Sequence, residues 1–175
     1  MQFETERLLI RPIQASDHDA LQAMILDPQV VAYLRYRTLE TPAAFDDAFK
    51  THFMADSTTT FGLERKRDHQ LIGFYEFHVD AHMGELTYAL SPAAWGHGYV
   101  AEAGQKMMAY GFESLGLTHI EAHYASVNPR SGRVMAKLGM HDEGELQTFT
   151  LPSGELIHVM AYGLNKNEWQ REKSA

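Results

Sequence analysis

Cysteine is absent from this sequence of 175 residues. Its absence excludes disulfide bonds, a thiolate nucleophile and any zinc site built on cysteine. Histidine is not scarce, with ten residues, but none shows the H-E-x-x-H or H-x-H spacing of metal ligands. No metal site is therefore expected.

The sequence has few positive charges: it contains 15 Lys and Arg residues but 23 Asp and Glu residues, which gives a formal net charge of -8. Binding to nucleic acid depends on a surplus of Lys and Arg on one face, so nucleic acid is not an expected partner. The opening "MQFETERLLIRP" carries charges where a signal peptide needs an apolar run. The sequence therefore predicts a cytoplasmic protein with no membrane partner.

The composition is otherwise that of a globular protein, with 45% apolar and 22% charged residues. We find no linker, no internal repeat and no low-complexity segment. At this length the chain can bury a sizeable core, and we expect one domain over residues 1–175.

Hydrophobic periodicity predicts a strand, helices, three antiparallel strands, a helix, a strand, a helix and a hairpin, in this order. The expected strands span 6–13, 58–66, 70–79, 84–91, 118–127, 144–151 and 155–164. The expected helices span 16–27, 28–36, 41–56, 101–116 and 131–139. Ser16 and Thr41 are the expected N-caps, and Pro28 is expected to stop the first helix. The fold class is α/β (α+β), a mixed and mostly antiparallel sheet of six to seven strands flanked by helices.

The segment "LSPAAWGHGYVAEAG" (90–104) places two glycines between a strand and a helix. Such a loop can hold a phosphate, because the amides that open a helix lack partners within it and glycine lets the backbone approach closely. "GHGYVA" formally matches a dinucleotide-binding fingerprint, but it follows an antiparallel meander rather than the first strand of a βαβ unit. No P-loop pattern occurs. A plain tight turn is the remaining alternative.

A second segment, "NPRSGRVMAKLGM" (128–140), follows about 30 residues later in the chain. Together with "TERLLIRP", "DPQVVAYL" and "WGHGYVAEA", it resembles the GNAT superfamily of N-acetyltransferases. The order of the four segments is similar to the branch of ribosomal-protein N-terminal acetyltransferases. The resemblance implies a GNAT-like domain that passes acetyl from acetyl-CoA (coenzyme A) to an amine acceptor, with the coenzyme's pyrophosphate at the glycine loop.

The resemblance also assigns residues to the coenzyme, and one backbone amide near Leu90 to the oxyanion of the reaction. The assigned residues are Leu90, Gly96, His97, Gly98, Tyr99, Val100, Ala101, Asn128, Ser131 and Arg133. Arg133 belongs to a basic stripe with Arg130 and Lys137, which is read either as a solvated helix face or as a contact to coenzyme phosphate. For Asn128 and Ser131 the alternative is helix capping.

The catalytic candidates are Glu85, His123 and Ser131. In the branch that the chain resembles, the base is a Glu at the position of Thr150, and many relatives of the superfamily have a Tyr donor where Met135 stands. Glu85, on the expected strand 84–91, is the substitute candidate for the base, with a solvated edge of the sheet as the alternative for its side chain. His123 is the second choice. Ser131 is the candidate proton donor to the departing thiolate.

The acceptor amine is not specified by the sequence. Tyr33 and Tyr36 are candidate acceptor-binding residues near Arg35 and Arg37, and simple packing is the alternative for both tyrosines. The resemblance suggests a protein N-terminus, while a small-molecule amine and a CoA-binding module without turnover remain alternatives. Whether the chain forms a homodimer is left open.

Overall fold

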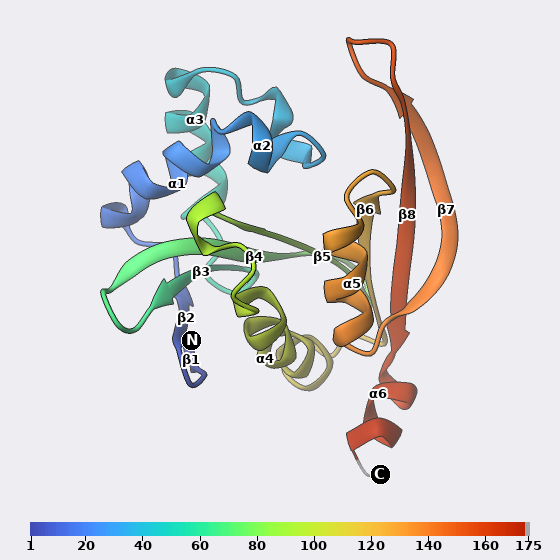
Figure 1. Ribbon diagram of the computed structural model, residues 1–175. Coiled ribbons are helices and arrows are strands. Elements are labelled where there is room, and N and C mark those ends of the chain that lie inside the picture. Colours follow the sequence, from blue (N-terminus) through green and yellow to red (C-terminus); the bar gives the residue numbers. More distant parts are fainter. Residues whose placement is uncertain (174–175) are drawn as a thin grey trace. The chain divides into compact units, whose positions relative to one another are not determined.

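The computed structural model describes residues 1–173, apart from the side chain of Glu172. The strands are β1 (Phe3–Glu4), β2 (Leu8–Pro12), β3 (Thr60–Arg65), β4 (Gln70–Asp80), β5 (Met83–Leu90), β6 (His119–Ala125), β7 (His141–Thr150) and β8 (Leu156–Asn165). The α-helices are α1 (His18–Ile25), α2 (Pro28–Val31), α3 (Pro42–Ala48), α4 (Tyr99–Glu113), α5 (Pro129–Lys137) and α6 (Lys166–Lys173), labelled in Figure 1. Short 3₁₀ turns η1 (Ala15–Asp17), η2 (Arg35–Thr38) and η4 (Pro92–Ala94) and a π-helical turn η3 (Phe49–Phe53) complete the order.

The strands form an eight-stranded sheet in the order β1-β2-β3-β4-β5-β6-β8-β7. Its pairs are mostly antiparallel, and β5 with β6 is a parallel pair. The predicted mixed α/β class is confirmed, with one strand more than the upper expectation. The additional strand is β1, which pairs Phe3 with Ile10 and is too short to show an alternating pattern in the sequence.

The chain divides into two compact units. Unit 1 comprises residues 1–76 and 88–103, and unit 2 comprises residues 77–87 and the chain from 104 onward. β4, β5 and α4 each contribute residues to both. The expectation of a single domain over the whole chain stays a prediction.

The core of unit 1 joins α1 to α3 with the strands beneath them (Figure 1). Phe45 and Phe53 come from the helical segment, and Phe74 comes from β4. The helical aromatic stripe continues past α3 into η3, whose Phe49 and Phe53 are buried. Burial of these rings removes large apolar areas from water, which explains why this region folds against the sheet.

The beginnings of the helices in unit 1 only partly follow the sequence prediction. Thr41 caps α3 by accepting a hydrogen bond from the Ala44 amide, as expected. Ser16 was the wrong N-cap for α1, because η1 precedes the helix and Asp17 stands at the cap position. Pro28 does more than end the first helix, since it is also the first residue of α2.

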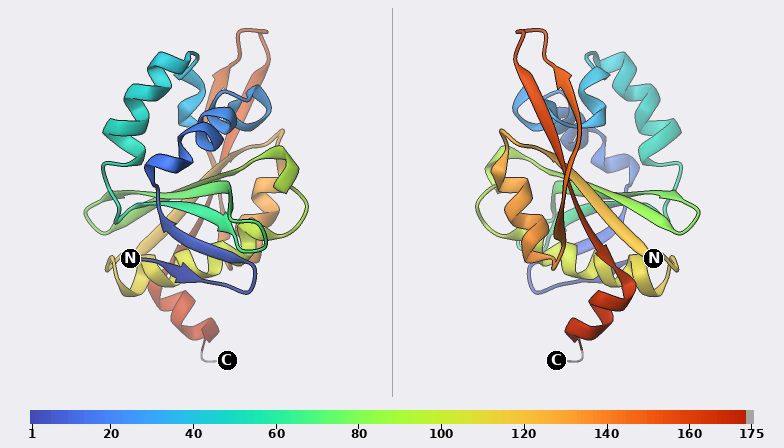
Figure 2. Two further views of the ribbon diagram at one scale, coloured as in Figure 1. Left: turned by 90° about the vertical axis from the view of Figure 1, so that its left-hand side faces the viewer. Right: turned by 90° about the vertical axis from the view of Figure 1, so that its right-hand side faces the viewer.

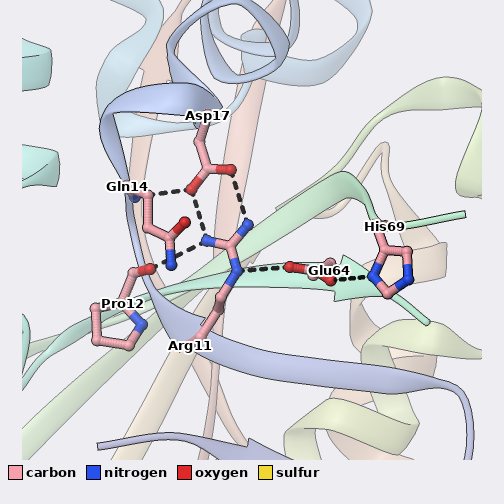
Figure 3. A network of polar contacts seen from close by, with 6 residues as sticks. All are labelled: Arg11, Pro12, Gln14, Asp17, Glu64 and His69. Atoms are coloured by element: carbon pink, nitrogen blue, oxygen red, sulfur yellow. Dashed lines mark hydrogen bonds and ion pairs between the residues drawn. The ribbon is translucent and has the colours of Figure 1, made fainter.

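Asp17 is not used as a conventional cap because its carboxylate pairs with Arg11 (Figure 3). Arg11 Nη1 and Nη2 donate to the two carboxylate oxygens of Asp17, at 2.7 and 2.9 Å. Arg11 Nε donates to Glu64 at 2.7 Å. The hydrogen bond to Asp17 raises the pKa of Arg11 against the opposing effect of burial. Arg11 therefore links β2 to η1 and to β3 through a buried ion-pair network.

Unit 2 is built on β6 and β8, which pair from His119↔Asn165 to Ala125↔Val159. The apolar face of α4 is buried, including Met107 and Tyr110, and so are Ile120, Ala122 and Ala125 of β6. β7 and β8 form the predicted hairpin, a long twisted ribbon in Figure 2, and β7 begins at His141 rather than at 144.

Candidate functional site

The loop before α4 has the backbone that its glycines predict. Gly96 and Gly98 both have a φ of +78°, which lies in the left-handed region that other residues rarely adopt. Glu102 N–H makes the first helical bond, to Gly98 O at 3.1 Å. The amides from Gly96 to Ala101 precede this bond and open a helix of 15 residues. This is the geometry by which a helix N-terminus attracts an anion.

Arg7 connects this loop to the first turn of α4. Its guanidinium donates to His97 O at 3.0 Å and pairs with Glu102 Oε2 at 2.6 Å, and it lies 4.5 Å above the ring centre of Tyr99. Thr5 Oγ1 also donates to Glu102, at 2.5 Å. Burial alone would raise the pKa of Glu102, but these hydrogen bonds and the charge of Arg7 hold it below its ordinary value.

The pairing with Arg7 neutralises the carboxylate that lies nearest to the helix start. An anion at the loop therefore does not face an uncompensated negative charge from Glu102. Sequence reasoning did not single out Arg7 within the segment "TERLLIRP", because its partner His97 is 90 residues away along the chain.

The loop is further fixed from the strands of unit 1. The Tyr75 hydroxyl on β4 donates to Val100 O at 2.7 Å, and Trp95 Nε1 donates to Leu90 O at 2.9 Å. His97 stacks on Tyr99 with 5.6 Å between ring centres. The predicted coenzyme residues from Leu90 to Ala101 thus belong to one segment, which is held by the side chains of Arg7, Tyr75 and Trp95.

Leu90, the predicted source of the oxyanion donor, ends β5. The next amide, that of Ser91, donates to Ile72 O of β4 at 2.8 Å. Successive amides of a strand point to opposite sides, so the Leu90 N–H points away from β4. The pairing of β5 with β6 covers Met83 to Glu85, which leaves Leu90 beyond it. The orientation of the Leu90 amide fits the expected donor.

In unit 2, Asn128 and Ser131 meet at the beginning of α5. Asn128 occupies the N-cap position without a capping side-chain bond, and its Nδ2 donates to Ser131 Oγ at 3.2 Å. The alternative that the Asn128 side chain caps the helix is therefore wrong. Arg133 is exposed, as are Arg130 and Lys137, so the basic stripe lies on the solvent face of α5.

The two base candidates lie together in unit 2. His123 Nδ1 on β6 is 3.6 Å from Glu85 Oε1 on β5, and His123 Nε2 is 3.2 Å from Glu121 Oε1. All three side chains are partly exposed. Glu85 stands opposite Glu121 in the parallel register, which brings two carboxylates to one imidazole. Glu121 was not a candidate in the sequence.

A related group is formed by His119, Glu121 and Glu143, each of which offers one ligand atom within 4.8 Å of the others. Glu143 comes from β7, and its Oε1 is 3.5 Å from His119 Nε2. Residue spacing along the chain could not show a group gathered from two strands. We assign no metal to it, and the expectation that the protein holds no metal stays a prediction.

Of the two predicted acceptor residues, Tyr33 is 37% exposed and Tyr36 is buried. Packing explains Tyr36 only in part, because its hydroxyl donates to the buried carboxylate of Glu76 and lies 2.8 Å from His52 Nε2. Neither Glu76 nor His52 was a candidate in the sequence. His52 could have been noticed only as the polar member of an aromatic helical stripe.

Residues 7–141 match the family described as an acetyltransferase (GNAT) domain. The chain is also 32% identical over 177 residues to the uncharacterized N-acetyltransferase p20 of Bacillus licheniformis, with 94% of this chain and 96% of that one covered.

Two solved structures have the same fold. Spermidine N-acetyltransferase from Vibrio cholerae, in complex with CoA and spermine, has a TM-score of 0.82 at 18% identity and covers 95% of this chain and 99% of its own. Ribosomal-protein-S5-alanine acetyltransferase from Vibrio fischeri has a TM-score of 0.76 at 21% identity, with 97% and 98% covered.

Proposed function

Because the chain belongs to the GNAT family of acetyl-CoA-dependent N-acetyltransferases, we propose that it transfers acetyl directly to a primary amine at a protein N-terminus. A direct transfer needs no enzyme nucleophile, which agrees with the lack of cysteine. Acetyl-CoA supplies an already activated thioester. The protein then has to hold the coenzyme, stabilise the oxyanion and accept the proton of the amine.

The observation that carries this proposal is the loop of Gly96 and Gly98 at the beginning of α4. Both glycines have a left-handed backbone, and a Cβ at Gly96 would meet no atom within 4 Å. Successive amides open a long helix there, and Arg7 neutralises the neighbouring Glu102. An uncluttered backbone with a favourable dipole fits the pyrophosphate of coenzyme A.

We assign the remaining roles from the environment of each residue. The Leu90 amide is the proposed oxyanion donor. Glu85 and His123, whose side chains are 3.6 Å apart, act together as the base that takes the proton from the acceptor ammonium. Ser131, held by Asn128, is the proposed proton donor to the departing thiolate.

The choice of a protein N-terminus is supported by the resemblance of four sequence segments to the ribosomal-protein branch. The test is release of CoA thiol with three acceptors: a peptide that begins with alanine, the same peptide with an acetylated N-terminus, and spermidine. We expect turnover with the first peptide alone. Turnover with spermidine and not with either peptide would contradict the proposed acceptor and favour a small amine.

A further inference from the structure

Three polar side chains meet in the core of unit 1. Glu76 on β4 is 3% exposed, and its two carboxylate oxygens accept hydrogen bonds from the Tyr36 hydroxyl and from His52 Nε2, the latter at 2.8 Å. The rings of Phe53 and Phe74 surround Tyr36, with centres at 5.0 and 5.8 Å. Burying a carboxylate in such apolar surroundings lowers the free energy of unfolding unless the carboxylate is paired. The presence of Glu76 here therefore suggests a role beyond packing.

The cluster holds an ion pair of Glu76 and His52. The hydrogen bond to Glu76 raises the pKa of His52, against burial and the charge of Arg35. Burial would raise the pKa of Glu76, but the hydrogen bonds from His52 and Tyr36, with the charges of His52 and Arg35, hold it below its ordinary value. Both shifts favour a carboxylate beside an imidazolium.

The imidazolium has a second donor that the cluster does not use. Both ring nitrogens of a protonated histidine donate, and Nε2 is directed at Glu76. Over residues 1–173, Nδ1 has no hydrogen-bond partner. The His52 side chain is 39% exposed, whereas that of Glu76 is 4% exposed, so His52 is the open end of the cluster.

This open end lies on the face of β4 opposite to the coenzyme loop. Tyr75 and Glu76 are consecutive, and consecutive side chains of a strand point to opposite faces. Tyr75 contacts Val100 in the first turn of α4, and Glu76 contacts His52. His52 therefore lies on the face of β4 that the first turn of α4 does not contact, and we take this face as the side from which an acceptor approaches.

We propose that His52 recognises the acceptor by donating a hydrogen bond from Nδ1 to a carbonyl or carboxylate oxygen beside the acceptor's amine. Glu76 and Tyr36 are positioning residues that fix the ring. This inference rests on the proposed function and names the group that is recognised beside the acceptor's amine, namely the carbonyl of a peptide N-terminus or the carboxylate of a free α-amino acid. Polyamines are disfavoured, because an imidazolium repels a second ammonium group.

The test compares KM and kcat for alaninamide and alanine in the wild type and in His52→Gln, and the wild type is also assayed for turnover of spermidine. We expect the variant to raise the KM of alaninamide or alanine about tenfold, because a charged hydrogen bond is lost, and to leave its kcat within about twofold. Alaninamide and alanine distinguish a carbonyl from a carboxylate as the recognised group. His18→Gln is the matched control, since His18 also pairs with carboxylates in unit 1 but lies outside the cluster.

The pH dependence separates recognition from a purely structural role. The groups facing His52 are Glu76, Tyr36 and Arg35. Protonated His52 binds, so KM for alaninamide should rise as pH increases through the raised pKa of His52. Glu76→Gln removes the carboxylate that raises this pKa, and the rise should move to lower pH. The titration of the amine itself is common to both proteins and cancels in the comparison.

The proposal is overturned if His52→Gln leaves the KM of both alaninamide and alanine unchanged, or if it lowers kcat as much as it raises KM. An unchanged midpoint in a folded Glu76→Gln variant also overturns it. If that variant does not fold, the comparison of acceptors in His52→Gln decides alone. Failure of the proposed function is distinguishable, because the wild type would then release no CoA thiol with alaninamide or alanine, or would release it with spermidine alone.

Discussion

At the residue scale, the proposed coenzyme loop is held by contacts with residues that are distant along the chain. Arg7 reaches His97 and Glu102, and Tyr75 reaches Val100. Each of these contacts restrains a segment whose glycines would otherwise leave it mobile, since glycine loses more conformational freedom on ordering than any other residue. The loop is therefore preorganised by side chains that come from β4 and from the turn before β2.

The proposed acid–base residues give a prediction at this scale. Glu85→Gln and His123→Gln should each lower kcat/KM about a hundredfold, because a general base commonly contributes this much. Ser131→Ala should lower kcat if its hydroxyl protonates the thiolate. Initial rates of thiol release over a range of pH provide the measurement.

Glu145→Gln is the matched control, because Glu145 also pairs with a histidine in unit 2, at 2.7 Å, but lies on the β7–β8 hairpin. Its kcat/KM should remain at the wild-type value. Rates within about twofold of wild type in both the Glu85 and His123 variants would mean that neither side chain is the base. Unchanged kcat and KM in Ser131→Ala would leave protonation of the thiolate to water.

At the scale of elements, the Arg11 network gives a prediction for stability. Asp17→Asn keeps the shape of the side chain but leaves the guanidinium with Glu64 as its remaining carboxylate partner. Loss of one partner of a buried ion pair costs about 3 kcal/mol of the free energy of unfolding. Urea unfolding of the two proteins measures this difference.

The control for this experiment is Asp19→Asn. Asp19 is fully exposed and contacts His18 on the surface, so its loss should leave the unfolding midpoint at the wild-type value. Equal midpoints for Asp17→Asn and Asp19→Asn would show that the ion pair does not join β2 to η1 energetically.

Periodicity in the sequence was sufficient for most of the longer elements, but it missed the short β1 and also α6, whose eight residues are mostly polar. β3 to β8 and α3 to α5 each expose a pattern over several residues, and all were predicted with shifts of a few positions. β1 has two residues, and η1 is a single turn whose Asp17 is recruited by Arg11. Tertiary contacts decide such elements, so local sequence cannot specify them.

The candidate site was predictable where it is local in sequence. Gly96 and Gly98 follow from their spacing before a helix, and Asn128 and Ser131 follow from a second motif. The pairing of His123 with Glu85, and the cluster of His52 with Glu76, come from residues distant along the chain. Neither has a spacing that marks it before the chain is folded.

At the scale of the whole molecule, both units carry parts of the proposed chemistry. Unit 1 holds the glycine loop and the His52 cluster, and unit 2 holds the Glu85 and His123 pair with the beginning of α5. In the part of the chain that the structure describes, no helix is both long and apolar enough to traverse a bilayer.

The central claim is that the loop at Gly98 holds the pyrophosphate of acetyl-CoA, and the most direct test is the acetyl-CoA dissociation constant of Gly98→Asp against Gly98→Asn. Both side chains have the same shape and tolerate the left-handed backbone at φ +78°, so their difference isolates the charge. We expect isothermal titration calorimetry to find binding about a hundredfold weaker in the Asp variant than in the Asn variant. Equal dissociation constants for the two variants would contradict the assignment.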